Sequence, residues 1–163
     1  MKHILIMRHA KSDWSNNAQS DFERPLNSSG RKAAPEVGSL IKKKKLVPEL
    51  ILSSPAERAL ETTHAVRETC DLTEENVVFE EEFYTGYVPE VAKRLKTLEE
   101  NINRVLVVGH NPTWTNLVTH LSGEFSEMKT AEVCILSFDG EWKNLAKASC
   151  KFVEKLRTRN AEL

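Results

Sequence analysis

Ile4-Leu5-Ile6-Met7-Arg8-His9-Ala10 (residues 4–10) places an arginine and a histidine directly after four large apolar residues. Four consecutive apolar side chains followed by a polar break are typical of a buried strand in a parallel sheet, not of an amphipathic helix. In open α/β sheets, ligands bind in the crevice beyond the carboxyl ends of the strands. The stretch therefore predicts an α/β fold and places Arg8 and His9 where a ligand would bind. Taken alone, such a pair is more often accidental than functional.

A second apolar run, residues 50–54, ends before a proline that suits the first turn of a helix. The helix expected over residues 56–70 carries Arg58 near its start, where backbone N–H groups already favour an anion. The alternative is a surface arginine that pairs with Glu57 or Glu61. Arg58 is thus a second candidate cation at a strand end.

A further apolar run, residues 104–108, repeats the design of the first. Gly109 permits a close backbone approach, and His110 follows just before a new helix. Because the carboxyl ends of parallel strands meet at one edge of a sheet, we expect the side chains at the three strand ends to lie together. They are Arg8, His9, Arg58 and His110.

The remaining segments supply the other elements of the α/β fold. We expect helices over residues 27–45, 89–100 and 113–121, and strands over residues 77–79 and 133–138. Pro35 implies that the first of these helices starts late or is kinked. Asp139-Gly140 predicts a hairpin turn into a last strand near residues 145–149, followed by a short charged helix from Lys151.

The long polar segment 11–25 is a candidate wall or lid of the expected pocket, because it starts beside Arg8 and His9. The alternative is a solvated connection that Trp14 and Phe22 hold in place. Arg24, near its end, could form an ion pair with Asp21 or point back at an anion.

Composition indicates an ordinary globular chain, which we expect to form one domain over residues 1–163. Its net charge of -1 provides no general attraction for nucleic acid or for an anionic membrane. Cys70, Cys134 and Cys150 are odd in number and far apart, so we expect reduced thiols. No stretch resembles a signal peptide or a membrane span, and a cytoplasmic location is the expectation.

Two histidines with two or three arginines, and without a matching carboxylate cluster, form a poor site for a divalent metal ion. They suit phosphoryl transfer instead. Guanidinium groups bind phosphate oxygens in pairs, and a neutral imidazole can attack phosphorus. We therefore expect no metal and no cofactor.

Several motifs resemble those of the histidine phosphatase (phosphoglycerate mutase-like) superfamily, and most closely those of its phosphohistidine phosphatase branch. The motifs are Met7-Arg8-His9-Ala10, Asp21 through Leu26, Ser54-Pro55-Ala56-Glu57-Arg58-Ala59, Val108-Gly109-His110-Asn111-Pro112 and Met128-Lys129-Thr130. They follow one another over nearly the whole chain. Ala10 stands where the family usually has glycine, a change that narrows the backbone choices there.

This resemblance implies a three-layer α/β sandwich with a mostly parallel central sheet and helices on both faces. It also implies a metal-independent phosphatase in which His9 is the nucleophile that becomes phosphorylated. Arg8, Arg58 and His110 would form the phosphate pocket, and Arg24, Asn111 and Thr130 would add substrate contacts. The partner would be a phosphohistidine protein or a small phosphorylated substrate, bound by a monomer or weak dimer without nucleic acid or membrane.

The general acid is the main departure from the rest of the superfamily. Mutases and sugar phosphatases of this family place a glutamate after the third strand, where this chain has Phe83-Tyr84-Thr85-Gly86. We expect the acid to be missing, which a phosphoramidate tolerates because its nitrogen leaves more readily than an alkoxide. The alternatives are a small-molecule phosphomonoesterase or mutase, with Glu82 or Asp13 as proton donor, and a non-catalytic phospho-binding module. A binding module would need the arginines but not both His9 and His110.

Overall fold

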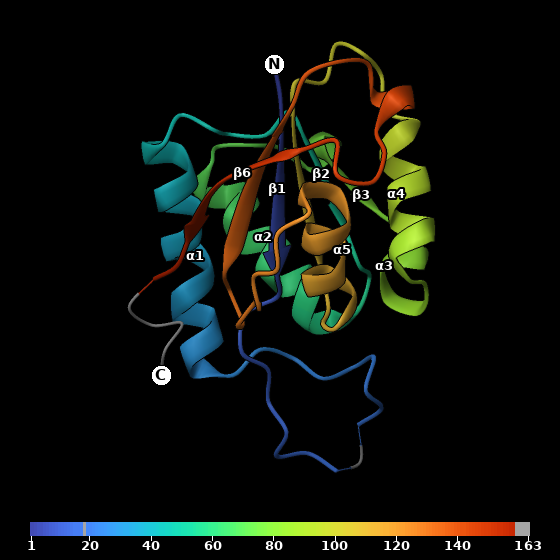
Figure 1. Ribbon diagram of the computed structural model, residues 1–163. Helices are drawn as coiled ribbons and strands as arrows, with labels where there is room; N and C mark the ends of the chain where they lie inside the picture. The colour runs from blue at the N-terminus through green and yellow to red at the C-terminus, as the bar shows by residue number, and fades with distance from the viewer. Residues whose placement is uncertain (18, 159–163) are drawn as a thin grey trace.

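A six-stranded sheet of order β3-β2-β4-β1-β5-β6 forms the centre of the computed structural model, which describes residues 1–17 and 19–158 (Figure 1). The strands are β1 Lys2–Arg8, β2 Leu50–Ser53, β3 Val77–Phe79, β4 Arg104–Gly109, β5 Val133–Phe138 and β6 Lys151–Leu156. β3, β2, β4 and β1 are parallel neighbours, β5 is antiparallel to β1, and β6 is antiparallel to β5. The sheet is therefore mostly parallel, as predicted.

Helices cover both faces of this sheet (Figure 1). They are α1 Ser28–Lys43, α2 Glu57–Thr69, α3 Glu82–Thr85, α4 Val88–Lys96 and α5 Thr113–Ser122, with short 3₁₀ turns η1 Glu74–Asn76 and η2 Trp142–Asn144. Leu5 and Met7 pack with α1 and α2, whereas Ile4 and Ile6 pack with α4 and α5. Both faces of β1 are buried, which explains its unbroken apolar run. None of these helices has the length and apolarity that crossing a membrane demands.

Helix α1 begins at Ser28, before Pro35 and earlier than one of the two expectations from this proline. The Asn27 side chain caps it by accepting a hydrogen bond from the Gly30 backbone N–H at 2.8 Å. Pro35 lies inside the helix, where it removes one backbone hydrogen bond. The expectation of a late start is therefore wrong, because the cap at Asn27 fixes the beginning of the helix.

The C-terminal elements differ most from the prediction. The strand expected near residues 145–149 is instead β6, Lys151–Leu156, so the charged helix expected from Lys151 is also wrong. Between β5 and β6, the buried side chain of Trp142 donates a hydrogen bond to the Ile102 carbonyl at 2.9 Å. This bond attaches the segment between the two strands to the residues just before β4. β6 is an edge strand, and charged side chains are usual on an exposed edge. Its Lys and Glu residues therefore resembled a solvated helix.

The segment between β1 and α1 crosses beneath the lower ends of the strands as a long loop (Figure 1). A short antiparallel bridge between Ser12 and Leu26 holds its two ends together. The carboxyl ends of β1, β2 and β4 point toward it, since these strands are parallel. The loop thus forms one wall of the space beyond the strand ends.

Candidate active site

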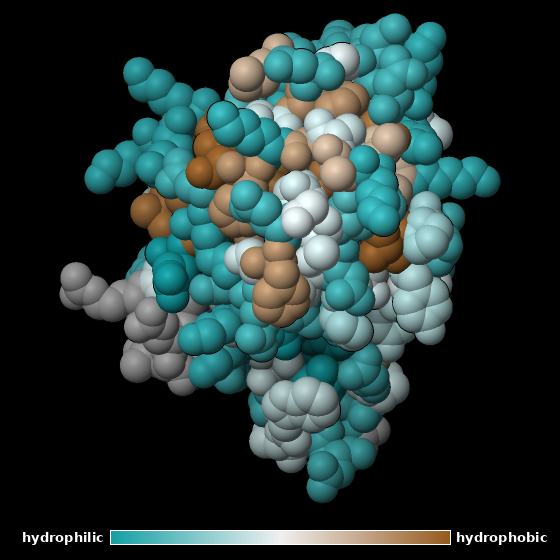
Figure 2. All heavy atoms as spheres, viewed as in Figure 1, coloured by the Kyte–Doolittle hydropathy of each residue, from teal (hydrophilic) through white to brown (hydrophobic). Residues whose placement is uncertain are grey.

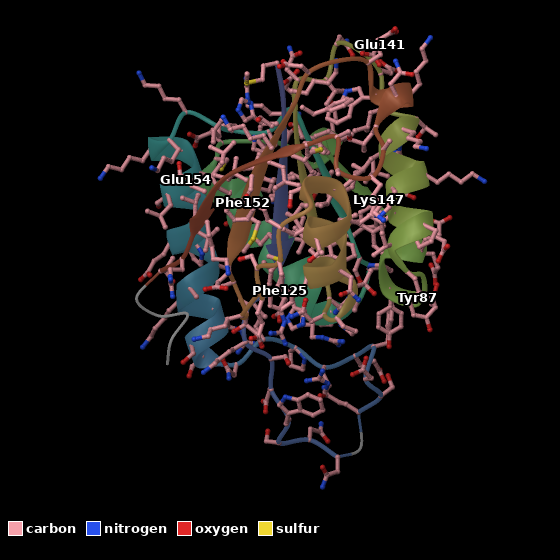
Figure 3. All side chains as sticks on the ribbon, viewed as in Figure 1. Tyr87, Phe125, Glu141, Lys147, Phe152 and Glu154 are labelled. Carbon is pink, nitrogen blue, oxygen red and sulfur yellow. The ribbon has the colours of Figure 1, made fainter. Side chains whose placement is uncertain are left out.

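A cavity of about 610 Å³ lies between the strand ends and the 11–25 loop. The catalytic and substrate-binding residues expected from the resemblance all line it: Arg8, His9, Arg24, Arg58, His110, Asn111 and Thr130. The surface at this end of the molecule is predominantly hydrophilic (Figure 2). Side-chain nitrogens gather between the strands and the loop (Figure 3). The fold therefore brings together residues that are more than a hundred positions apart in the sequence.

His9 has a defined tautomer, because its Nδ1 lies 2.6 Å from the Ala10 carbonyl oxygen. A carbonyl only accepts hydrogen bonds, so Nδ1 carries the proton and Nε2 holds the lone pair. Nε2 accepts a hydrogen bond from Arg58 Nε at 3.4 Å. Burial, followed by the neighbouring His110, lowers the pKa of His9 well below its usual value. His9 is therefore a neutral imidazole whose free nitrogen faces a guanidinium group.

Arg58 is buried at the start of α2 and turns toward the loop. Its NH1 donates to the Asp21 carbonyl at 2.7 Å, and its NH2 donates to Asp21 Oδ2 at 3.1 Å. The alternative pairing with Glu57 or Glu61 is not what the structure has. Glu61 instead binds Arg31 and a backbone N–H of the loop. Arg58 thus belongs to the cavity.

Arg8 contributes a donor that has no protein partner. Its NH1 donates to the Met128 carbonyl at 3.2 Å, but its buried Nε has no hydrogen-bond partner among the described residues. Burial, followed by the charge of Arg58, lowers the pKa of Arg8 from its usual value. A buried donor without a partner is costly, so Arg8 keeps unused hydrogen-bonding capacity in a side chain that lines the cavity.

His110 lies against His9, with ring centroids 5.1 Å apart. Its Nε2 is 2.7 Å from Ser54 Oγ, whereas its buried Nδ1 has no partner among the described residues. Burial first, and then the charge of Arg58, lowers the pKa of His110 to about 3. His110 is therefore neutral near pH 7 and has one free ring nitrogen beside the nucleophile candidate.

Arg24 combines both arrangements that the sequence left open, since it binds Asp21 and also lines the cavity. Its guanidinium carbon lies 3.4 Å from the centre of the exposed Trp14 ring, a cation–π arrangement. Asn111 lines the cavity, but both polar atoms of its side-chain amide form hydrogen bonds within the protein. Nδ2 donates to the Met128 carbonyl at 2.7 Å, and Oδ1 accepts from Thr115. The structure thus gives Asn111 a part in fixing the cavity wall.

Asp21 and Tyr84 also belong to this site, although no pattern in the sequence indicated either of them. Asp21 accepts hydrogen bonds from Arg24, Arg58 and the Tyr84 hydroxyl, the last at 2.8 Å. Partial burial opposes ionisation of Asp21, but the hydrogen bonds and the Arg58 charge outweigh it and lower the pKa to about 2. The spacing of Asp21 and Arg24 was a signal for their local ion pair only.

The proton donors considered for a phosphomonoesterase lie elsewhere. Glu82 lines a separate depression with Glu80 and Arg94, and Asp13 binds the backbone N–H of Ser15 at the surface. Neither residue lines the cavity, where Asp21 is the one carboxylate among the described residues. The described part of the chain also contains no cluster of three or more metal-ligating side chains.

The chain is similar in sequence and in fold to several known proteins. The family model of the histidine phosphatase superfamily (branch 1) matches residues 4–84. Phosphohistidine phosphatase SixA of Escherichia coli is 33% identical over 78% of this chain and 79% of its own length. Its homolog in Haemophilus influenzae is 33% identical over 85% and 89%, respectively. The solved structure of the protein histidine phosphatase SixA with tungstate superimposes with a TM-score of 0.83, at 26% identity, over 95% of this chain and 96% of that one.

Proposed function

This chain belongs to the histidine phosphatase superfamily, and we propose that it is a metal-independent phosphatase that removes phosphate from phosphohistidine in proteins through a phosphorylated His9. Relatives named phosphohistidine phosphatase, which match this chain over most of their length, support the substrate class. The cationic cavity supports the chemistry.

In the proposed reaction, His9 Nε2 attacks the phosphorus atom as a neutral nucleophile. The bond from phosphorus to the leaving nitrogen breaks, and its electron pair stays on that nitrogen. Arg8 and Arg58 donate hydrogen bonds to the phosphoryl oxygens. His110 adds a donor from Nδ1 in the tautomer whose Nε2 accepts the hydrogen bond from Ser54 Oγ. Water then attacks phospho-His9, which releases inorganic phosphate and restores the imidazole.

One observation favours a nitrogen leaving group over an alkoxide. Asp21, the single carboxylate that lines the cavity among the described residues, has a pKa of about 2 and is ionised near neutral pH. It therefore has no proton to give to a strongly basic alkoxide. A phosphoramidate needs this proton much less, because its leaving nitrogen is less basic or is already protonated. Glu82 and Asp13, the donors that a phosphomonoesterase would use, lie outside the cavity.

Turnover measurements test this function. The full chain, treated with chelator, is assayed with a phosphohistidine peptide and with the same peptide phosphorylated on serine. We expect kcat/KM to be at least about tenfold higher for phosphohistidine, and we expect His9→Ala to remove the activity. A preference for phosphoserine would support a phosphomonoesterase. Loss of activity in chelator that added Mg²⁺ or Zn²⁺ restores would indicate a metal-dependent reaction instead.

A further inference from the structure

The carboxylate of Asp21 is an unexpected group in a cavity that suits a phosphate. Its Oδ1 accepts hydrogen bonds from Arg24 Nε and NH2 at 3.2 and 3.1 Å. Its Oδ2 accepts from Arg58 NH2 at 3.1 Å and from the Tyr84 hydroxyl at 2.8 Å. An ionised carboxylate repels a phosphate dianion, so on electrostatic grounds it weakens the binding of a simple phosphate. A favourable contact between Asp21 and the part of the substrate that carries the phosphate would offset this repulsion.

Asp21 lies on the side of the cavity through which a leaving group must depart. Its side chain is 52% exposed, whereas His9 is only 6% exposed at the inner end of the same cavity. In an in-line displacement the leaving group lies opposite the attacking atom. A group leaving from phosphorus on His9 therefore points outward, past Asp21.

We expect a phosphoryl group on His9 to change the partners of Asp21. In the free protein both oxygens of the carboxylate accept two hydrogen bonds each. That fills the roughly four lone-pair positions of a carboxylate. Arg58 Nε lies 3.4 Å from His9 Nε2, in the space that phosphorus takes when it bonds to this nitrogen. The guanidinium group must therefore shift when His9 carries a phosphoryl group, and we expect the bond from its NH2 to Asp21 Oδ2 to break in this shift. This movement frees one acceptor position at the mouth of the cavity, next to the leaving group.

The ring of phosphohistidine can fill that acceptor position. Its second ring nitrogen, the one without phosphorus, carries a proton in the cationic form of the ring. A neighbouring carboxylate favours this form and accepts the N–H hydrogen bond. When the P–N bond breaks, the electron pair stays on the ring nitrogen that carried phosphorus. The ring leaves as neutral imidazole, and the enzyme donates no proton.

We infer that Asp21 determines the specificity of this site, because its carboxylate binds the protonated ring of phosphohistidine after Arg58 has moved to the phosphate. A phosphate ester lacks the N–H cation and meets only the repulsion of the carboxylate. This inference rests on the proposed function and names the residue that selects nitrogen leaving groups over oxygen ones. The hydrogen bond from Tyr84 keeps the carboxylate at the mouth of the cavity.

Asp21→Asn in the full chain tests the inference, because asparagine keeps the shape but loses the charge. The substrates are a phosphohistidine peptide and p-nitrophenyl phosphate, whose leaving group needs no general acid. We expect the ratio of kcat/KM for phosphohistidine to that for p-nitrophenyl phosphate to fall about tenfold or more. Asp13→Asn is the matched control, since Asp13 is a partly exposed aspartate of the same loop that does not line the cavity. It should leave the ratio unchanged.

Binding of inorganic phosphate, measured by calorimetry, distinguishes specificity from a purely structural role. Removal of a negative charge should leave phosphate affinity equal or higher in Asp21→Asn. Weaker phosphate binding, or an equal loss of turnover with both substrates, would show that Asp21 only holds the arginines in place and would overturn the inference. If the unaltered protein fails to prefer phosphohistidine, the proposed function itself fails. An unchanged ratio in Asp21→Asn, with that preference intact in the unaltered protein, overturns the inference alone.

Discussion

Two neutral imidazoles in a cationic cavity define the site at the scale of single residues. His9 and His110 lie close together, and burial is the largest cause of the lowered pKa of each. The nearby arginines act in the same direction. A neutral His9 keeps its Nε2 lone pair available for attack over a wider range of pH than an exposed histidine would.

The same lowered pKa values make stability depend on pH. Unfolding returns the pKa of His110 from about 3 to its ordinary value of 6.5, so between these values the unfolded chain binds more protons than the folded one. The free energy of unfolding should therefore fall as the pH drops below about 6.5. Urea denaturation at about pH 7 and 5.5, in buffer without phosphate, measures this effect. His110→Gln should show a smaller fall than the unaltered protein, and an identical fall in both would contradict the assignment.

Strand ends were the part of the site that the sequence could predict. Arg8, His9, Arg58 and His110 each follow an apolar run closely, and parallel strands bring such ends together. Asp21 could not be placed in this way. Its bonds to Arg58 and Tyr84 span 37 and 63 residues and depend on how the long loop folds back. No local pattern encodes that path.

At the scale of elements, the close contact between β4 and α5 fixes the position of His110. The Trp114 indole packs against Gly109, where a Cβ atom would overlap the ring, and its Nε1 donates to the Val107 carbonyl at 3.1 Å. The glycine predicted to allow close approach does so for Trp114. The strand end and the next helix are thus joined next to His110.

Gly109→Ala should therefore lower the free energy of unfolding by about 1–3 kcal/mol, the usual cost of overpacking a core. Because the change adjoins His110, turnover should fall as well. Urea denaturation of Gly109→Ala, Trp114→Phe and the double variant forms a cycle that isolates the contact. The smaller phenylalanine ring leaves room for the methyl group that Gly109→Ala adds. The free energy of unfolding of the double variant should therefore fall by less than the sum of the falls in the two single variants. Strictly additive losses would show that the two residues do not compete for this space.

Other elements show where prediction from the sequence ends. The apolar strands β1, β2, β4 and β5 were found within a residue or two of their observed bounds, because burial on both faces leaves an unbroken apolar run. The edge strand β6 was missed, since its charged side chains carry no such run. Its pairing with β5 is a long-range contact that follows from the sheet.

At the scale of the whole molecule, the residues that stabilise the fold and those that line the cavity lie in different places. Two apolar cores, one on each face of the sheet, hold the strands together. The cationic groups gather beyond the carboxyl ends of the strands, where the long loop closes one side of the cavity (Figure 1). This arrangement leaves the mouth of the cavity bordered by loop residues, which we propose meet the protein that carries the phosphohistidine.

The most direct test of the account is the detection of phosphate on His9 during turnover. The protein is mixed with a phosphoramidate or a phosphohistidine peptide, quenched in alkali within the first turnovers, digested and analysed by mass spectrometry. We predict an acid-labile, alkali-stable phosphate on the peptide that contains His9, and none in His9→Ala. Phosphate found on another residue, or near-normal turnover by His9→Ala, would contradict it.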